Sequence, residues 1–295
     1  MKPKLQATFL AIGIAIAATA AALTGIFYRS GSGSFVYTSI RGHAVNIYGK
    51  GLYQHMSTEV AIQGIAQDYI TLFIAVPLLL FALYKASSGQ LKWKLLLTGT
   101  VGYFLVTYVF YLAMAMYNSF FLVYTFLAGA SFYLFLLLIH SFAASALPQH
   151  FSKSTPVKSA GGFLIFNAVC IALLWLGVVV PPLLNGSVIP VEVEHYTTLI
   201  VQGFDLAILL PGSFLTGLWL MQKKPLGYLW APVYYVFLSL LMTALTAKII
   251  AMAQHGYNVI PAIFIIPAFN LLSIIFAVVL LKNIKTNVTE NIQKP

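Results

Sequence analysis

Eight apolar blocks follow one another along the chain, and each has about the 20 residues that an α-helix needs to cross the hydrocarbon layer of a bilayer. Of the 295 residues, 60% are hydrophobic and 7% are charged, whereas soluble domains carry about 25% charged residues. A soluble globular protein is therefore excluded, as are the short alternating strands of an outer-membrane barrel. We predict an all-α fold, a polytopic bundle of eight transmembrane helices that forms a single transmembrane domain over residues 1–295. The expected spans are 7–28, 60–84, 95–115, 119–140, 160–182, 197–221, 226–250 and 258–281.

Positive charges are distributed unevenly between the two sides of these spans. Only Arg29, Arg41 and Lys50 fall on the odd-numbered loops. Because cationic loops resist translocation, both termini are expected on the cytoplasmic side of the membrane. The formal charge of +10 is mostly this orientation signal, and no basic cluster with interleaved aromatic residues indicates a nucleic-acid partner. The lysines of the termini and even-numbered loops are Lys2, Lys4, Lys85, Lys92, Lys94, Lys153, Lys158, Lys223, Lys224, Lys282, Lys285 and Lys294.

The first outer loop, residues 29–58, is longer than a simple connection requires. A Gly/Ser run at 31–34 precedes two stretches, 35–40 and 44–48, in which β-branched and aromatic residues recur around Arg41-Gly42-His43. This pattern predicts a short β-hairpin over the outer face. The alternative interpretation is an external loop without regular structure.

The two halves, residues 1–150 and 151–295, show signs of a parallel four-plus-four duplication. The second and sixth spans each carry a Gln-Gly pair near the outer end, followed by Asp68 or Asp205. Internal repeats place binding sites between the repeats in many transporters. Similar helix lengths alone would also produce such spacings.

Polar residues in the second, sixth and seventh spans predict an outward-facing pocket. Acids within a span are costly, so Asp68 and Asp205 are functional candidates, and Lys248 is the intramembrane cation that could reach them. The neighbouring polar residues recur at helical spacing and so share faces with the acids. The candidate ligand-binding residues are Glu59, Gln63, Gln67, Asp68, His195, Gln202, Asp205 and Lys248.

Structural interpretations of the same residues stay open. Lys248 could extend its ammonium group to the outer headgroups, and the two aspartates could hold helices together. The glutamines and threonines could form interhelical hydrogen bonds without touching a ligand. The stripe of Tyr103, Thr107 and Tyr111 in the third span is read as packing rather than as a substrate path.

The sequence indicates no cofactor and no catalytic residue. Its histidines lie outside the middle of the spans, which disfavours bis-histidine haem ligation, and its single cysteine, Cys170, has no partner for a disulfide. Catalytic motifs of the common hydrolase, zinc-protease and nucleotide-binding types are absent. We predict no metal site, with one alternative at the outer surface formed by His55, Glu59, Glu194 and His195.

Several short motifs resemble a family of bacterial and archaeal eight-span membrane proteins that has no established activity. The resemblance implies an intact eight-helix membrane protein in a prokaryotic plasma membrane, and it places recurring residues near the outer face. The residues that carry it are Arg41-Gly42, Tyr48-Gly49, Gly51-Leu52-Tyr53, Gln67-Asp68, Pro77-Leu78-Leu79-Leu80, Tyr117-Asn118, Phe121-Leu122, Tyr124, Asp205 and Pro225-Leu226-Gly227-Tyr228.

Three functions compete. The favoured one is binding or transport of a small molecule or ion through the outward-facing pocket. The alternatives are a structural or sensory component that acts through its outer loop, and a membrane enzyme that uses the aspartates as acid and base. The lipid bilayer is an expected partner in every case, and the sequence indicates no particular protein partner.

Overall fold

The computed structural model describes residues 3–114 and 116–285, and within them eight helical segments are long and apolar enough to cross a membrane. Their bounds lie within about four residues of the expected spans, and several helices are slightly longer than expected. The spans are Leu5–Phe27, Thr58–Ala86, Leu91–Met114, Phe121–His140, Val157–Asn185, Ile200–Met221, Pro225–Gln254 and Ala262–Lys282. Large apolar side chains such as Phe9, Leu173 and Phe264 point outward from these helices, as a lipid environment requires. The protein is a multi-pass helical membrane protein.

Six spans are single helices, whereas the second and the sixth are each interrupted by one π-helical turn. The uninterrupted spans are α1 (Pro3–Phe27), α4 (Leu91–Met114), α5 (Phe121–His140), α7 (Val157–Asn185), α10 (Pro225–Gln254) and α11 (Ala262–Lys282). The second span consists of α2 (Thr58–Ile70), the π-helix η2 (Thr71–Ala75) and α3 (Val76–Ala86). The sixth consists of α8 (Ile200–Phe204), the π-helix η5 (Asp205–Leu209) and α9 (Leu210–Met221). Short helices are η1 (Gly51–Tyr53), η3 (Ala144–Ala146), α6 (Leu147–His150) and η4 (Val191–Val193).

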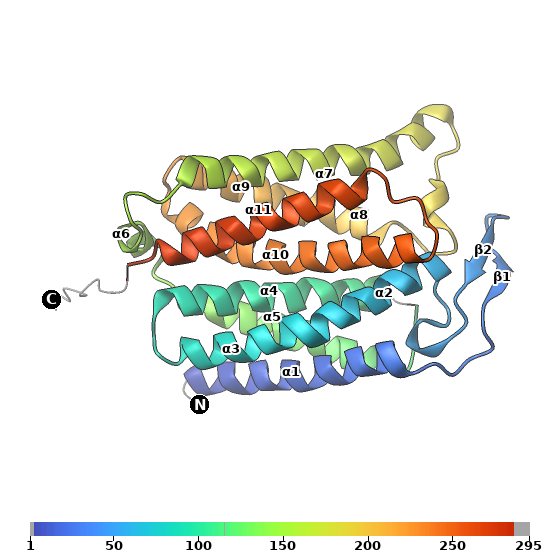
Figure 1. Ribbon diagram of the computed structural model, residues 1–295, viewed down its shortest axis with the longest axis horizontal. Helices are drawn as coiled ribbons and strands as arrows, with labels where there is room; N and C mark the ends of the chain where they lie inside the picture. The colour runs from blue at the N-terminus through green and yellow to red at the C-terminus, as the bar shows by residue number, and fades with distance from the viewer. Residues whose placement is uncertain (1–2, 115, 286–295) are drawn as a thin grey trace.

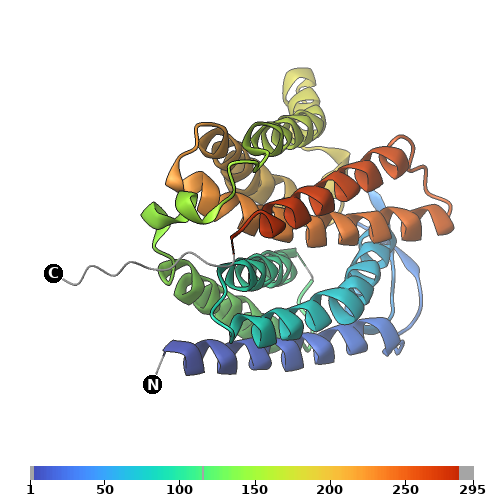
Figure 2. The ribbon, with the colours of Figure 1, turned by 60° about the vertical axis from the view of Figure 1, so that its left-hand side comes forward.

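The helices of the first and second halves form two groups that lie side by side (Figure 1, Figure 2). Helices α4 and α10 pack against each other at the centre and join the groups, and α2 also packs on α10. The approach of α4 to α10 depends on Gly99, where a Cβ atom would collide with the Val233 carbonyl and the Val236 side chain. The main hydrophobic core therefore runs through α4 and α10 and connects both halves.

A β-hairpin covers one end of the bundle, as the sequence predicts (Figure 1). Strands β1 (Phe35–Thr38) and β2 (Ala44–Ile47) pair antiparallel, with Phe35 opposite Ile47 and Thr38 opposite Ala44. An isolated bridge between Ile47 and Ser57 continues the pairing toward α2. We call this end of the molecule the hairpin end and the other the terminal end, because the first and last described residues lie there.

The α3–α4, α5–α7 and α9–α10 connections lie at the terminal end with the two chain ends, and the α1–β1, β1–β2 and β2–η1 connections lie at the hairpin end (Figure 1). The first group carries the described lysines of the termini and the even-numbered loops, and the second carries Arg29, Arg41 and Lys50. Lys2 and Lys294 fall outside the described residues. The fold thus keeps apart the two charge groups from which the orientation is predicted. Which end faces the cytoplasm stays a prediction.

The two π-helices occupy related places in the two halves. Each ends two residues before a proline, Pro77 in the second span and Pro211 in the sixth. Counting back from these prolines, Asp205 corresponds to Thr71, so the two aspartates lie one helical turn apart in this register. The prolines and the π-helices are compatible with a duplication of the halves, which stays a prediction.

Candidate functional site

Two polar side chains of the second span, Gln67 and Thr71, face the third span. The Gln67 side chain is buried, and its amide nitrogen lies 2.7 Å from the Tyr103 hydroxyl and 3.4 Å from the Thr107 hydroxyl. One helical turn further, the Thr71 hydroxyl lies 2.9 Å from the same Tyr103 oxygen. Gln67 and Thr71 thus form interhelical hydrogen bonds, which is one of the structural interpretations of the sequence. Their partners, Tyr103 and Thr107, belong to the polar stripe of α4.

Asp68 is buried, with 2% of its surface exposed, and tyrosine hydroxyls satisfy both of its carboxylate oxygens. Tyr53 donates to Oδ2 at 2.5 Å and Tyr111 donates to Oδ1 at 3.0 Å. Burial, followed by the charge of Asp68, raises the pKa of Tyr53 well above its ordinary value, so this hydroxyl keeps the proton that it donates. Gly25 of α1 lies directly behind the carboxylate, where a Cβ atom would overlap Oδ2. Because a buried carboxylate needs such donors, this arrangement allows Asp68 to reside inside the bundle.

The Tyr111 hydroxyl has one hydrogen but two acceptors within reach. It lies 3.0 Å from Asp68 Oδ1 and 3.2 Å from the Gly64 carbonyl oxygen, while the Tyr53 hydroxyl is 3.3 Å away. The ring of Tyr111 is packed edge-on against the ring of Tyr124, at 5.4 Å between centroids. Tyr111 can therefore exchange its hydrogen bond to Asp68 for one to the helix backbone without moving its ring.

Asp205, at the first position of the π-helix η5, is separate from this tyrosine network. It is partly buried and accepts a hydrogen bond of 2.8 Å from the indole nitrogen of Trp175 on α7. Lys248 on α10 lies near enough for its charge to act on both aspartates, more strongly on Asp205 than on Asp68. Within the described residues the structure shows no hydrogen bond or ion pair of the Lys248 ammonium group. Among the described residues, the three intramembrane charged side chains thus form no direct ion pair with one another.

Segment 191–199, which precedes α8, is tied to the hairpin end by Arg41. The Arg41 guanidinium donates to the carbonyl oxygens of Glu194 and Tyr196, at 3.2 and 3.0 Å. The buried Tyr196 hydroxyl accepts a hydrogen bond of 3.1 Å from the Ser57 backbone nitrogen, and burial raises its pKa to about 12. Arg41 and Tyr196 therefore join the turn of the hairpin, the start of α2 and the entry to the sixth span.

His195 in this segment has one partnered and one unpartnered ring nitrogen. Its Nε2 lies 2.9 Å from the His55 carbonyl oxygen, which requires a donor at Nε2. In the neutral ring this leaves Nδ1 as an acceptor. Nδ1 is buried, and among the described residues it has no hydrogen-bond partner. Buried polar atoms are rarely left unpaired, so Nδ1 is an unsatisfied acceptor in this structure.

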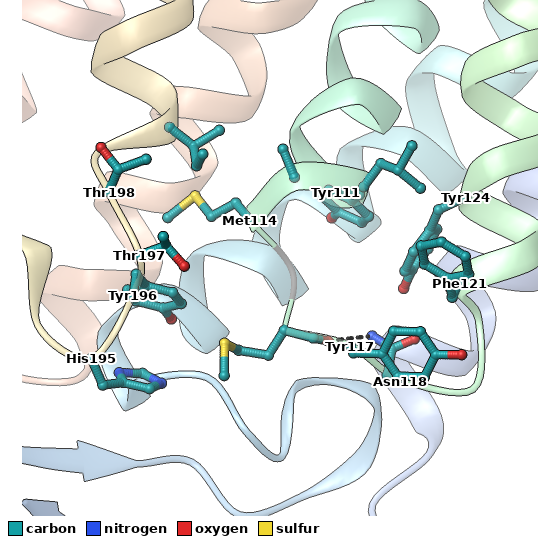
Figure 3. Close-up of a pocket in the computed structure, with 14 residues that line it drawn as sticks. Tyr111, Met114, Tyr117, Asn118, Phe121, Tyr124, His195, Tyr196, Thr197 and Thr198 are labelled. Atoms are coloured by element: carbon teal, nitrogen blue, oxygen red, sulfur yellow. Dashed lines mark hydrogen bonds between the residues drawn. The ribbon is translucent and has the colours of Figure 1, made fainter. Parts of the chain in front are cut away.

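A cavity of about 250 Å³ opens beside His195, between segment 195–200 and the α4–α5 connection (Figure 3). One side carries His195, Tyr196, Thr197 and Thr198. Residues of the other side include Tyr111, Tyr117, Asn118, Phe121 and Tyr124. Tyr111 belongs to this lining and also hydrogen-bonds to Asp68, so the cavity and the buried carboxylate share one side chain.

The remaining predicted site residues lie apart from the cavity lining. Glu59, in the first turn of α2, is partly buried and lies near the charges of Glu194 and Glu192. Gln63 and Gln202 are partly buried on α2 and α8. Among residues 3–114 and 116–285, no group of three or more His, Cys, Asp or Glu side chains is arranged to hold a metal ion.

Of the eight predicted residues, His195 lines the cavity, and Asp68 adjoins it through Tyr111. The cavity beside His195 lies toward α4 and α5 rather than between the second, sixth and seventh spans. Whether the eight residues contact a ligand stays a prediction. The sequence reasoning did not foresee the roles of Tyr53, Tyr111 and Trp175. The helical spacing from Tyr103 to Tyr111 and the Gly51-Leu52-Tyr53 motif were the available signals.

Comparison with known proteins gives no further information on this site. The chain matches no protein-family model, no curated protein and no solved structure.

Proposed function

We propose that the protein binds a small polar molecule or cation at the hairpin end and transports it across the membrane. The observation that carries this proposal is that one side chain, Tyr111, both lines the cavity and hydrogen-bonds to the buried Asp68. We place the protein in a prokaryotic plasma membrane with the hairpin end outside. The lysine distribution and the resemblance to prokaryotic eight-span proteins support that placement.

The chemistry of the site favours a ligand that donates hydrogen bonds. His195 Nδ1 offers a buried acceptor beside the cavity, and the hydroxyls of Thr197 and Thr198 add further polar groups. Two aspartates against one lysine make the formal charge of the intramembrane cluster negative, which favours a cation or an amine. A ligand that draws the Tyr111 hydroxyl away from Asp68 would free one carboxylate oxygen. Binding at the cavity would thereby change the hydrogen bonding of an acid inside the membrane.

The first experiment is a thermal-shift screen of the purified protein in detergent against metal cations, amines, amino acids and sugars. A ligand present at 100 times its dissociation constant stabilises a folded protein by about 2.7 kcal/mol, which is readily detected. The variants are Asp68→Asn, Asp205→Asn and Tyr111→Phe. Tyr133→Phe is the matched control, because Tyr133 is an exposed tyrosine on α5. Compounds that bind are then tested for uptake into proteoliposomes.

We expect a compound that stabilises the wild type and Tyr133→Phe with the same apparent affinity. Its apparent affinity for Asp68→Asn and Tyr111→Phe should be at least tenfold lower. Uptake should fall in the same variants. Equal stabilisation and uptake in all variants would contradict the proposal. If the variants are folded and no compound of these classes shifts the wild type, a small-molecule site is not supported, and the hairpin becomes the main candidate.

A second function is favoured by the exposed apolar surface of the hairpin. Val36 and Ile40 are among the most exposed large apolar residues at this end, and Ile40 has 93% of its surface accessible. Among the described residues no strand pairs with the outer edge of β1, whereas the outer edge of β2 carries the bridge to Ser57, so β1 presents the edge that a partner strand could extend. A structural or sensory role through contact with a protein partner would use this surface.

Point substitutions test this second function better than deletion of the loop, because deletion of residues 31–50 would also remove Arg41, which holds segment 191–199. The paired substitution Val36→Ser and Ile40→Ser should abolish co-purification of a partner that the wild type retains. Lys50→Ser serves as the control at another exposed position of the loop. Unchanged co-purification would exclude the hairpin surface as the contact.

A further inference from the structure

A second cavity lies between α2 and α10 at the hairpin end and has a volume of about 410 Å³. Its walls are apolar and include Ile62 and Ala66 on α2 and Ala247 and Ile250 on α10. It is distinct from the cavity beside His195, with which it shares no lining residue. We call it the lateral groove.

The lateral groove faces the surroundings of the bundle rather than its interior. Tyr69 and Ile250, which belong to its lining, have 43% and 46% of their surfaces exposed although both lie within spans. In a membrane, such surfaces contact lipid acyl chains. An apolar groove with this exposure suits a hydrocarbon chain.

Polar and basic side chains lie at one end of the lateral groove. Arg29 follows the end of α1 and His255 follows the end of α10, so both are expected where the helices leave the hydrocarbon layer. Arg29 donates one hydrogen bond of 2.6 Å to the Tyr48 hydroxyl and keeps further N–H donors. The His255 ring is held by a contact of 2.8 Å from Nδ1 to the Ala251 carbonyl oxygen. Among the described residues that line the groove, none is acidic.

We propose that the lateral groove binds an anionic phospholipid from the leaflet at the hairpin end, with an acyl chain between α2 and α10 and the phosphate at Arg29 and His255. The charge of the groove complements a phosphodiester, and guanidinium groups bind such oxygens with directed hydrogen bonds. The apolar walls distinguish this ligand from a free phosphate ion. The assignment does not depend on the function of the cavity beside His195.

The test compares phosphatidylglycerol with phosphatidylcholine of the same acyl composition, added to delipidated protein in detergent, with the shift in unfolding temperature as the readout. Variants are Arg29→Gln, which removes the charge, and Ala247→Leu, which fills the groove and leaves Arg29 in place. Lys50→Gln is the matched control, because it removes one exposed positive charge of the same loop outside the groove. Native mass spectrometry counts the lipids that remain bound.

We expect phosphatidylglycerol to stabilise the wild type and Lys50→Gln more than phosphatidylcholine does, with one lipid retained. Arg29→Gln should lose at least half of this difference, and Ala247→Leu should lose the retained lipid. Equal shifts with both lipids, or an undiminished preference in Arg29→Gln, would overturn the proposal. An equal shift with water-soluble glycerol phosphate would also overturn it and would indicate a site for the free anion. If Arg29→Gln fails to fold, Ala247→Leu and the lipid count decide the outcome.

Discussion

At the scale of single residues, the buried carboxylate of Asp68 depends on the absence of a side chain at Gly25. Replacement of Gly25 by alanine would place Cβ against Asp68 Oδ2 and displace it from the Tyr53 hydroxyl. Overpacking of this kind costs about 1–3 kcal/mol, more than the gain in helix propensity from glycine to alanine. We therefore expect Gly25→Ala to lower the unfolding temperature in detergent.

The control for this substitution is Gly129→Ala on α5, where a new Cβ atom would meet no other atom within 4 Å. The Gly129→Ala protein should be as stable as the wild type or slightly more stable. Equal unfolding temperatures for Gly25→Ala and Gly129→Ala would show that the Asp68 carboxylate does not need the space at Gly25.

At the scale of elements, the hairpin holds the entry to the sixth span through Arg41. Hydrogen bonds from a charged donor contribute about 1.5–3 kcal/mol, and Arg41→Ala removes three of them from segment 191–199, the third being a long one of 3.5 Å to the Thr197 carbonyl oxygen. We expect amide hydrogen exchange in this segment to accelerate about tenfold or more, while exchange in the centre of α10 stays unchanged. Lys50→Ala is the control with the same loss of charge. Equal exchange in segment 191–199 of all three proteins would contradict the role of Arg41.

At the scale of the whole molecule, the separation of charges predicts the orientation. In a Cys170→Ala background, Ser32→Cys at the hairpin end should react with a membrane-impermeant maleimide in intact cells. Ser88→Cys at the terminal end should react only after permeabilisation, because cationic loops stay in the cytoplasm. Both serines are exposed. The reverse pattern of labelling would place the hairpin in the cytoplasm and contradict the orientation.

Much of the architecture could be predicted because its causes are local. The eight spans follow from the free energy of transferring about 20 apolar residues into hydrocarbon, which does not depend on the neighbouring helices. The hairpin follows from β-branched and aromatic residues on either side of a turn with Gly42. The burial of Asp68 was also indicated, since an acid within a span must face the interior of a bundle.

The partners of those residues were decided by the tertiary structure. Helical periodicity shows which side chains share a face but not which helix lies opposite, so the match of Gln67 to Tyr103 could not be read from spacing. The Tyr53–Asp68 contact joins a loop to a span, and no local pattern sets that approach. The sequence by itself determined eight spans and the presence of intramembrane charges, and it left a hairpin and an irregular loop as alternatives for residues 29–58. Only the tertiary structure placed the cavity against α4 and α5, because cavities arise where packed helices fail to fill space.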